Sequence, residues 1–297
     1  MQPDSFLYYV GVDGGGTHCR VRIVDANGRC CAEAQGGSAN LYQQGYNALR
    51  TIEDTIAQAF TQISLAPDAL PVTLARTSVG LGLAGAELPE SQALIAQWQH
   101  PYSRIQVNND AHIACLGAHS GEEGGLVIVG TGIVAWAIQH DRTIMLDGWG
   151  FPLADQGSGA WLGMRAIQES LRASDGVRPR SPLTDRILAH FGQTPRAIPG
   201  WARDAHSSDF GQFARWVVQA FENGDALAQQ LVQEQAYAVG LLVQRLANLN
   251  VSRIALLGGL GPFVGTELVS HLRPLIVPAQ QDPLAGALLM IRQEAKP

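Results

Sequence analysis

The chain has 297 residues and a mass of 31.7 kDa, which is enough for about two domains of ordinary size. Apolar residues make up 46% and charged residues 15%, while 33 glycines and 15 prolines are spread without a period. This composition excludes a disordered, collagenous or coiled-coil chain. The net charge is −6 without a long run of either sign, so we expect small-molecule partners, no nucleic acid and no membrane.

Lysine is almost absent from the chain. All but one of the 20 basic residues are arginine, and the single lysine is Lys296. This excludes reactions that need a lysine in the pocket, such as those of Walker-type phosphate loops or Schiff-base enzymes. A phosphate site here would rely on backbone amides, a metal ion and arginine.

The four cysteines do not form a metal-binding or disulfide pattern. Cys30 and Cys31 are adjacent, and Cys19 and Cys115 are isolated, so we expect small apolar residues in a reducing compartment. The N-terminus has no basic leader, and the longest apolar stretch, residues 126–138, is shorter than the roughly 20 residues of a membrane span. These features predict a cytoplasmic protein.

The first part of the chain predicts an antiparallel start followed by alternating strands and helices. The predicted strands cover residues 6–13, 18–25, 29–35, 74–83 and 105–108. The predicted helices cover residues 45–65 and 90–99 and a short segment that begins at Asp110. Strands that alternate with helices indicate an α/β sheet.

The opening pattern of strand, glycine turn and hairpin then recurs. Strands are predicted at residues 125–129, 133–139, 143–146 and 253–257, and helices at 158–173, 183–191, 209–222, 225–249 and from Pro283 onward. We therefore expect two lobes, residues 1–117 and 118–297, with a cleft between them. The last helix is free to return to the first lobe.

Two glycine turns are the strongest local signals. Asp13 is followed by Gly14, Gly15, Gly16 and Thr17, and the second turn is Gly130-Thr131-Gly132. Glycines allow the backbone to turn so that successive amides point at one anion, and a carboxylate beside them suits a hydrated magnesium ion. The alternative for each turn is an ordinary glycine-rich hairpin.

Seven short motifs together carry a family resemblance. They are residues 13–17, 37–40, 109–110, 130–132, 148–150, 155–159 and 258–259. In order and spacing they resemble the N-acetylglucosamine and glucosamine kinases of the BadF/BadG type, within the actin-like, sugar-kinase and Hsp70 ATPase superfamily. The resemblance implies two ribonuclease H-like lobes with ATP and sugar in the cleft, and an ATP- and Mg²⁺-dependent kinase that acts on the 6-hydroxyl of an amino hexose.

The resemblance also implies roles for residues of the nucleotide site. The first phosphate loop corresponds to Gly14, Gly15, Gly16 and Thr17. The second phosphate loop corresponds to Gly130, Thr131 and Gly132. Asp13 corresponds to the residue that reaches magnesium through water. Gly258 and Gly259 resemble the turn that receives adenosine, for which an ordinary strand-to-helix turn is the alternative.

Asp110 is the expected catalytic base. It follows a predicted strand and begins a helix, whose dipole favours the ionised carboxylate. In the resembling kinases this residue accepts the proton of the sugar hydroxyl that attacks the γ-phosphate. The alternative role is that of a helix N-cap.

The remaining motifs imply a sugar site. Asn40, Asp110, Gly148, Trp149, Gly150 and Asp155 are the implied contacts, since amide and carboxylate groups can bridge neighbouring ring hydroxyls. The alternatives are a surface turn for Asn40, core packing for Trp149 and a helix N-cap for Asp155. Gln156 stands where the animal N-acetylglucosamine kinases have glutamate, so the choice between a free and an acetylated amine is left open.

Two other functions fit the same fold. An ATPase that activates a dehydratase holds an iron–sulfur cluster on cysteines of the second lobe, but no cysteine follows Cys115. A non-catalytic sugar sensor is the other alternative; the chain opens directly on a predicted strand and Asp110 is present, so we expect an enzyme. Whether the protein forms a homodimer is left open.

Overall fold

The computed structural model describes residues 6–66, 68–140 and 142–293, and Lys296 lies outside them. The chain divides into two compact units, Met1–Glu123 with Ala279–Pro297, and Gly124–Pro278. The division falls beyond residue 117 because the turn after helix α5 (Asp110–Ala118) is bonded back to that helix, with the Gly121 amide 2.7 Å from the Leu116 carbonyl.

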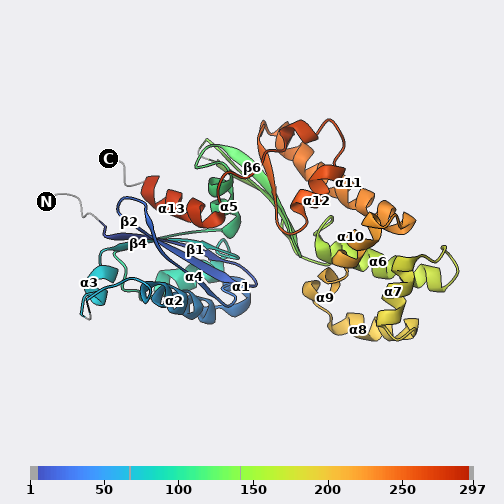
Figure 1. The fold of residues 1–297 in the computed structure, drawn as a ribbon, viewed down its shortest axis with the longest axis horizontal. Helices are drawn as coiled ribbons and strands as arrows, with labels where there is room; N and C mark the ends of the chain where they lie inside the picture. Colours follow the sequence, from blue (N-terminus) through green and yellow to red (C-terminus); the bar gives the residue numbers. More distant parts are fainter. Residues whose placement is uncertain (1–5, 67, 141, 294–297) are drawn as a thin grey trace. The chain divides into compact units, whose positions relative to one another are not determined.

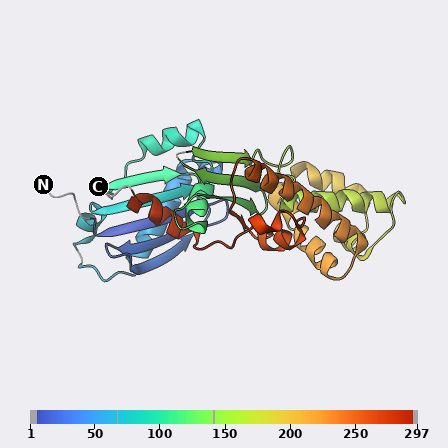
Figure 2. The ribbon, with the colours of Figure 1, turned by 90° about the horizontal axis from the view of Figure 1, so that it is seen from above.

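The first unit is built on a five-stranded sheet in the order β3-β2-β1-β4-β5 (Figure 2). The strands are β1 (Tyr8–Gly14), β2 (Cys19–Asp25), β3 (Cys30–Gly36), β4 (Thr77–Leu83) and β5 (Arg104–Asn108). β1, β2 and β3 pair antiparallel, whereas β4 lies parallel to both β1 and β5. The sequence placed all five strands but began β4 too early, since Leu74 ends a short helix, α3 (Leu70–Leu74).

Helices cover both faces of this sheet (Figure 1). The amphipathic helix α2 (Tyr46–Phe60) packs on β2 and β3, and its buried side includes Leu49, Ile52 and Ile56. α5 and α13 (Pro283–Gln293) lie side by side on the opposite face. Two smaller helices, α1 (Leu41–Gln44) and α4 (Pro89–Gln97), complete the unit. The last helix of the chain therefore packs on the first sheet.

Glycines allow α13 to approach the sheet and α5 unusually closely. A Cβ atom on Gly80 of β4 would collide with the backbone carbonyl of Ala287, and a Cβ atom on Gly286 of α13 would collide with the carbonyl of Ile113 in α5. Because backbone atoms cannot move aside as a flexible side chain can, both positions require glycine.

The second unit contains a four-stranded sheet in the order β8-β7-β6-β9. Its strands are β6 (Gly124–Val129), β7 (Ile133–Gln139), β8 (Arg142–Asp147) and β9 (Ile254–Leu257). β6 pairs antiparallel with β7 and parallel with β9. The long helix α11 (Ala226–Asn248) and α12 (Gly261–Glu267) pack on it through a core that includes Val239, Val243 and Ile254.

The rest of the second unit is helical. Its helices are α6 (Gly159–Ser174), α7 (Pro182–His190), α8 (Ile198–Asp204), α9 (Ser207–Gly211) and α10 (Ala214–Glu222). The single helix expected over residues 209–222 is wrong, since the chain turns at residues 212–213 between α9 and α10. The break allows Phe210 and Phe213 to enter the same apolar core. The sequence did not predict α8 or α12.

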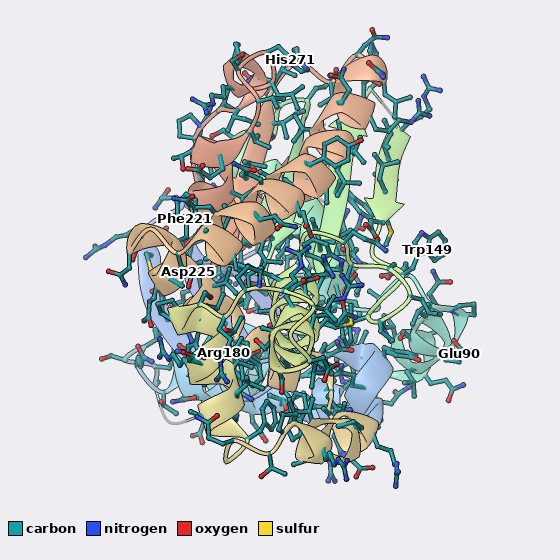
Figure 3. All side chains as sticks on the ribbon, turned by 90° about the vertical axis from the view of Figure 1, so that its right-hand side faces the viewer. Glu90, Trp149, Arg180, Phe221, Asp225 and His271 are labelled. Carbon is teal, nitrogen blue, oxygen red and sulfur yellow. The ribbon has the colours of Figure 1, made fainter. Side chains whose placement is uncertain are left out.

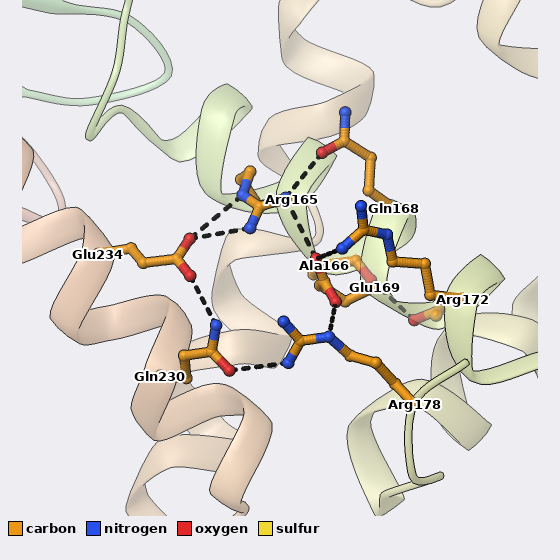
Figure 4. A network of polar contacts seen from close by, with 9 residues as sticks. Arg165, Ala166, Gln168, Glu169, Arg172, Arg178, Gln230 and Glu234 are labelled. Atoms are coloured by element: carbon orange, nitrogen blue, oxygen red, sulfur yellow. Dashed lines mark hydrogen bonds and ion pairs between the residues drawn. The ribbon is translucent and has the colours of Figure 1, made fainter. Parts of the chain in front are cut away.

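A buried ionic network joins α6 to α11 (Figure 4). Glu169 of α6 is fully buried and pairs with Arg165, Arg172 and Arg178. Arg165 also pairs with Glu234 of α11 at 3.0 Å, and Arg178 donates to Gln230 of α11 at 2.9 Å. Surrounding a buried carboxylate with guanidinium groups offsets the cost of removing it from water.

All four cysteines are free. Among the helices that the structure describes, no helix combines the length and the apolar character needed to cross a lipid bilayer.

Candidate functional site

The first glycine turn follows β1 and leads into β2. None of Gly14, Gly15 and Gly16 adopts a left-handed backbone. Close packing accounts for Gly14, because a Cβ atom there would lie 2.6 Å from Leu83 Cδ2. Gly16 and Thr17 are exposed, and their amides donate to no group within the described part of the chain. These amides are available to an anion.

Asp13 is the residue before Gly14, with which β1 ends. Its carboxylate is largely buried and pairs with Arg20 of β2. Burial raises the pKa of Asp13, and the Arg20 guanidinium partly opposes that effect. The carboxylate thus stands beside the free amides with a cation already on one side.

Asn40 lies beside the first turn. A Cβ atom on Gly16 would be 4.0 Å from Asn40 Nδ2, so the amide nitrogen of Asn40 faces the glycine turn. Its Oδ1 accepts from the Gln43 amide at 3.1 Å and caps α1. Capping fixes the side chain and leaves its nitrogen as a donor.

Asp110 is held at the start of α5 by its neighbours. Asn109, not Asp110, is the N-cap, since its Oδ1 accepts from the Ala111 amide at 2.7 Å. Glu87 accepts from Asn109 Nδ2 at 2.6 Å and so fixes the cap. Asp110 occupies the first helical position, and its Oδ1 accepts from the same Ala111 amide at 2.9 Å.

The helix start does not decide the pKa of Asp110, which is raised from its ordinary value. Burial, followed by the nearby charge of Asp13, raises the pKa of Asp110 to about 6, with a smaller contribution from Glu87. The helix start and the bond from Ala111 favour the ionised carboxylate, but burial outweighs them. A carboxylate with a pKa near 6 is a stronger base than an ordinary aspartate and is still ionised at neutral pH.

In the second unit, the turn that contains Gly258 lies against the end of β6, where the loop 130–132 begins. The Leu260 amide donates to the Val129 carbonyl at 3.0 Å. Gly258 has a left-handed backbone with φ of 82°, and a Cβ atom there would lie 2.5 Å from the Val129 carbonyl oxygen. Only glycine fits at this position. The turn after β9 therefore packs closely against Val129, the residue before the loop 130–132.

The loop 130–132 borders a groove of about 520 Å³. Gly130, Thr131 and Gly259 line it, and the amides of Thr131 and Gly132 donate to no group among the described residues. The opposite wall comes from the α9–α10 turn and includes Gly211, Gln212 and Arg215. Sequence reasoning missed this wall because it treated residues 209–222 as one continuous helix.

Asp155 lies against the same loop. A Cβ atom on Gly132 would be 3.0 Å from Asp155 Oδ2. Asp155 is buried and has a left-handed backbone with φ of 69°, a conformation that is strained for a residue with a side chain. Burial and the charge of Asp147 raise the pKa of Asp155. It does not cap α6, because that role belongs to Ser158.

Trp149 is the most exposed of the predicted site residues with a large side chain. It lies between Gly148 and Gly150 in the loop after β8, 85% exposed, and Figure 3 shows it projecting from that loop. The same loop carries Leu153, which is 90% exposed. Core packing is therefore excluded for Trp149, and the tryptophan is free to contact a ligand.

The residues present are compatible with a magnesium ion. No cluster of three or more histidine, cysteine, aspartate or glutamate residues in the described ranges could hold a metal ion by itself. Magnesium, however, usually binds one or two carboxylates, several waters and the substrate phosphates. Asp13 and Asp110 are close enough to raise each other's cost of ionisation, and a divalent cation would relieve that repulsion.

Comparisons with known proteins identify the family of the chain. The model of the BadF/BadG/BcrA/BcrD ATPase family matches residues 10–282. The glucosamine kinase GspK of Vibrio cholerae is 40% identical over 95% of both chains. The N-acetyl-D-glucosamine kinase of Dictyostelium discoideum is 27% identical over 78% of this chain and 76% of its own.

A solved structure extends the agreement to the fold. The crystal structure of a candidate N-acetylglucosamine kinase from Chromobacterium violaceum superposes with a TM-score of 0.86 and 32% identity, over 97% of this chain and 99% of that one. The α/β fold with two sheets is that of the actin-like sugar kinases. The chain belongs to the BadF/BadG/BcrA/BcrD ATPase family.

Proposed function

We propose that the protein is an ATP-dependent amino-hexose kinase that transfers the γ-phosphate to the 6-hydroxyl of glucosamine or N-acetylglucosamine. The observation that carries the proposal is Asp110, a fixed and partly buried carboxylate whose raised pKa suits a general base at neutral pH. Family membership and the 40% identity to a glucosamine kinase support this choice of reaction and substrate class.

In this proposal Asp110 accepts the proton of the sugar 6-hydroxyl as its oxygen attacks the γ-phosphate in line. Asn40 donates to a ring hydroxyl, and Asp155 accepts from two neighbouring hydroxyls. Trp149 offers its ring, and the backbone of Gly148 and Gly150 offers further polar groups.

In this proposal the nucleotide contacts come from one loop in each unit. The free amides of Gly16 and Thr17 bind phosphate in the first unit, together with the Thr17 hydroxyl; Gly14 and Gly15 keep that turn compact. The amides of Thr131 and Gly132 bind phosphate in the second unit, beside Gly130. Gly258 and Gly259 receive the adenosine. Oriented amides of this kind bind anions without a lysine.

Magnesium, when bound, would neutralise charge on the transferring phosphate. Asp13 would hold it through water. A chelator in excess is therefore expected to abolish activity, and Asp13→Asn is expected to raise the magnesium concentration that gives half-maximal rate. The sugar KM should change less than threefold. Unchanged turnover in excess chelator would contradict this role.

We also place the protein in the cytoplasm, where ATP is available.

The test is an ADP-release assay with glucosamine, N-acetylglucosamine, N-acetylmuramate and glucose. We expect ADP formation with at least one of the first two sugars, and a kcat/KM for glucose lower by an order of magnitude or more, because a site built to bond a nitrogen substituent leaves its partners unpaired with glucose. Sugar-independent ADP release would contradict the proposal. Equal kcat/KM values for glucose and both amino sugars would remove the amino-sugar assignment alone.

A further inference from the structure

Arg215 is a cation without a protein partner in the groove of the second unit. It lies at the second position of α10, is exposed, and lines the groove together with Gly130 and Thr131. It makes no hydrogen bond or ion pair with any residue that the structure describes. The groove has no acidic side chain among its lining residues, so nothing there neutralises the guanidinium.

The position of Arg215 in its helix is unfavourable for a cation. The start of a helix carries partial positive charge, so an arginine in the first turn is repelled by it. Phe213 at the N-cap supplies no side-chain acceptor. An anionic ligand in the groove would interact favourably with both the guanidinium and the helix start.

A second groove of the same unit differs, because its charged side chains have protein partners. That groove, of about 550 Å³, is lined by Arg180, Arg186 and Asp225 among others (Figure 3). Arg180 pairs with Asp185. Arg186 donates to Gln219 and stacks on Trp216. Asp225 accepts hydrogen bonds from backbone amides of α7 and α11. Each of these charges is already satisfied by the protein, whereas that of Arg215 is not.

Local packing places the α10 start near the phosphate loop. A Cβ atom on Gly159 would lie 3.0 Å from the Gly130 carbonyl oxygen and 3.6 Å from the Cβ of Ala214, the residue before Arg215. A Cβ atom on Gly211 would lie 3.3 Å from Thr131 Cγ2. The flexible side chain of Arg215 therefore starts within reach of a phosphate held by Thr131 and Gly132.

We propose that Arg215 binds the phosphate chain of the nucleotide and supplies the positive charge that a lysine supplies in other phosphate sites. The proposal rests on the proposed function, since it needs ATP in this groove. A guanidinium can donate two parallel hydrogen bonds to phosphate oxygens. This residue would set the preference for nucleoside di- and triphosphates over nucleosides, while Gly258 and Gly259 receive the adenosine.

The test measures equilibrium binding of ATP, ADP and adenosine by titration calorimetry, without sugar, for the wild type and three variants. Arg215→Ala is expected to weaken ATP and ADP binding at least tenfold and to leave adenosine binding within twofold. Arg215→Lys should recover part of the loss because it keeps the charge. Arg203→Ala, an exposed arginine of α8 that does not line the groove, serves as the matched control and should bind like the wild type.

Different outcomes separate the two proposals. Unchanged ATP binding by Arg215→Ala would overturn the role of Arg215 while leaving the kinase in place. An equal loss for adenosine would also overturn it, since the arginine would then contact the nucleoside. Absence of ATP binding by the wild type would overturn the proposed function and the role of Arg215 with it.

Discussion

Burial gives Asp110 two properties that can be measured separately. The first is basicity. If Asp110 is the base, kcat/KM for the sugar should fall tenfold per pH unit below the pKa of about 6, because only the ionised carboxylate accepts a proton. Asp110→Asn should lower kcat by roughly 10²–10⁴-fold at pH 8. Asp54→Asn, an exposed carboxylate of α2, is the control. A kcat of Asp110→Asn above a tenth of the wild-type value would contradict the assignment.

The second property is a cost in folding stability. The pKa of Asp110 is about 6 in the folded protein against 3.8 for an ordinary aspartate. The stability contributed by this group is present below about pH 4 and is lost as the pH rises through 6. Asp110→Asn should therefore unfold at higher urea than the wild type at pH 8, by up to about 3 kcal/mol, with a much smaller gain at pH 4.5. Lower stability of the variant at pH 8 would show that the carboxylate is not penalised by burial.

Sequence reasoning identified Asp110 as a candidate but not its electrostatics. The raised pKa depends first on burial and then on the charges of Asp13 and Glu87. Both residues are distant from Asp110 in the sequence, and the packing of β1, β4 and β5 brings them near it. Arg215 was missed for a similar reason, since its neighbours in the groove come from β6 and β9. Residue types and local motifs predict which groups are present, whereas their surroundings depend on tertiary packing.

At the scale of elements, Gly286 provides a test of close helix packing. Alanine is favoured over glycine in a helix by about 1 kcal/mol, yet a Cβ atom at Gly286 would collide with the Ile113 carbonyl. Gly286→Ala should therefore lower the free energy of unfolding by about 1–3 kcal/mol. Gly200→Ala in α8 is the matched control, because a Cβ atom there meets nothing within 4 Å. Gly200→Ala should leave the free energy of unfolding unchanged or raise it. An increase in the free energy of unfolding for Gly286→Ala would contradict the close packing of α13 on α5.

Most strands and long helices could be predicted from the sequence because each buries a regular face. The strands of both hairpins and helix α2 follow their apolar periodicity closely. The α9–α10 break could not be predicted in this way, since Phe210 and Phe213 keep a helical spacing across it and both belong to one core. The sequence around Glu169 also gave no local sign that this carboxylate would be buried among arginines.

At the scale of the whole molecule, the sequence pattern of a repeated strand, glycine turn and hairpin predicted two units, and the structure contains two compact units that each hold such a hairpin sheet. Each motif alone fits an ordinary turn, and the match of the family model over residues 10–282 shows that the resemblance drawn from the motifs together pointed to the right family. The identity of the sugar stays a proposal, because the family includes relatives named for glucosamine and for N-acetylglucosamine.

The most direct measurement of the central claim is the position of the phosphate in the product. The protein should be incubated with ATP, magnesium and either glucosamine or N-acetylglucosamine, and the product examined by ³¹P–¹H correlation NMR. The account predicts a phosphorus coupled to the two protons on carbon 6, and no product with Asp110→Asn under the same conditions. A phosphate on carbon 1, or ATP consumed without any phosphorylated sugar, would contradict it.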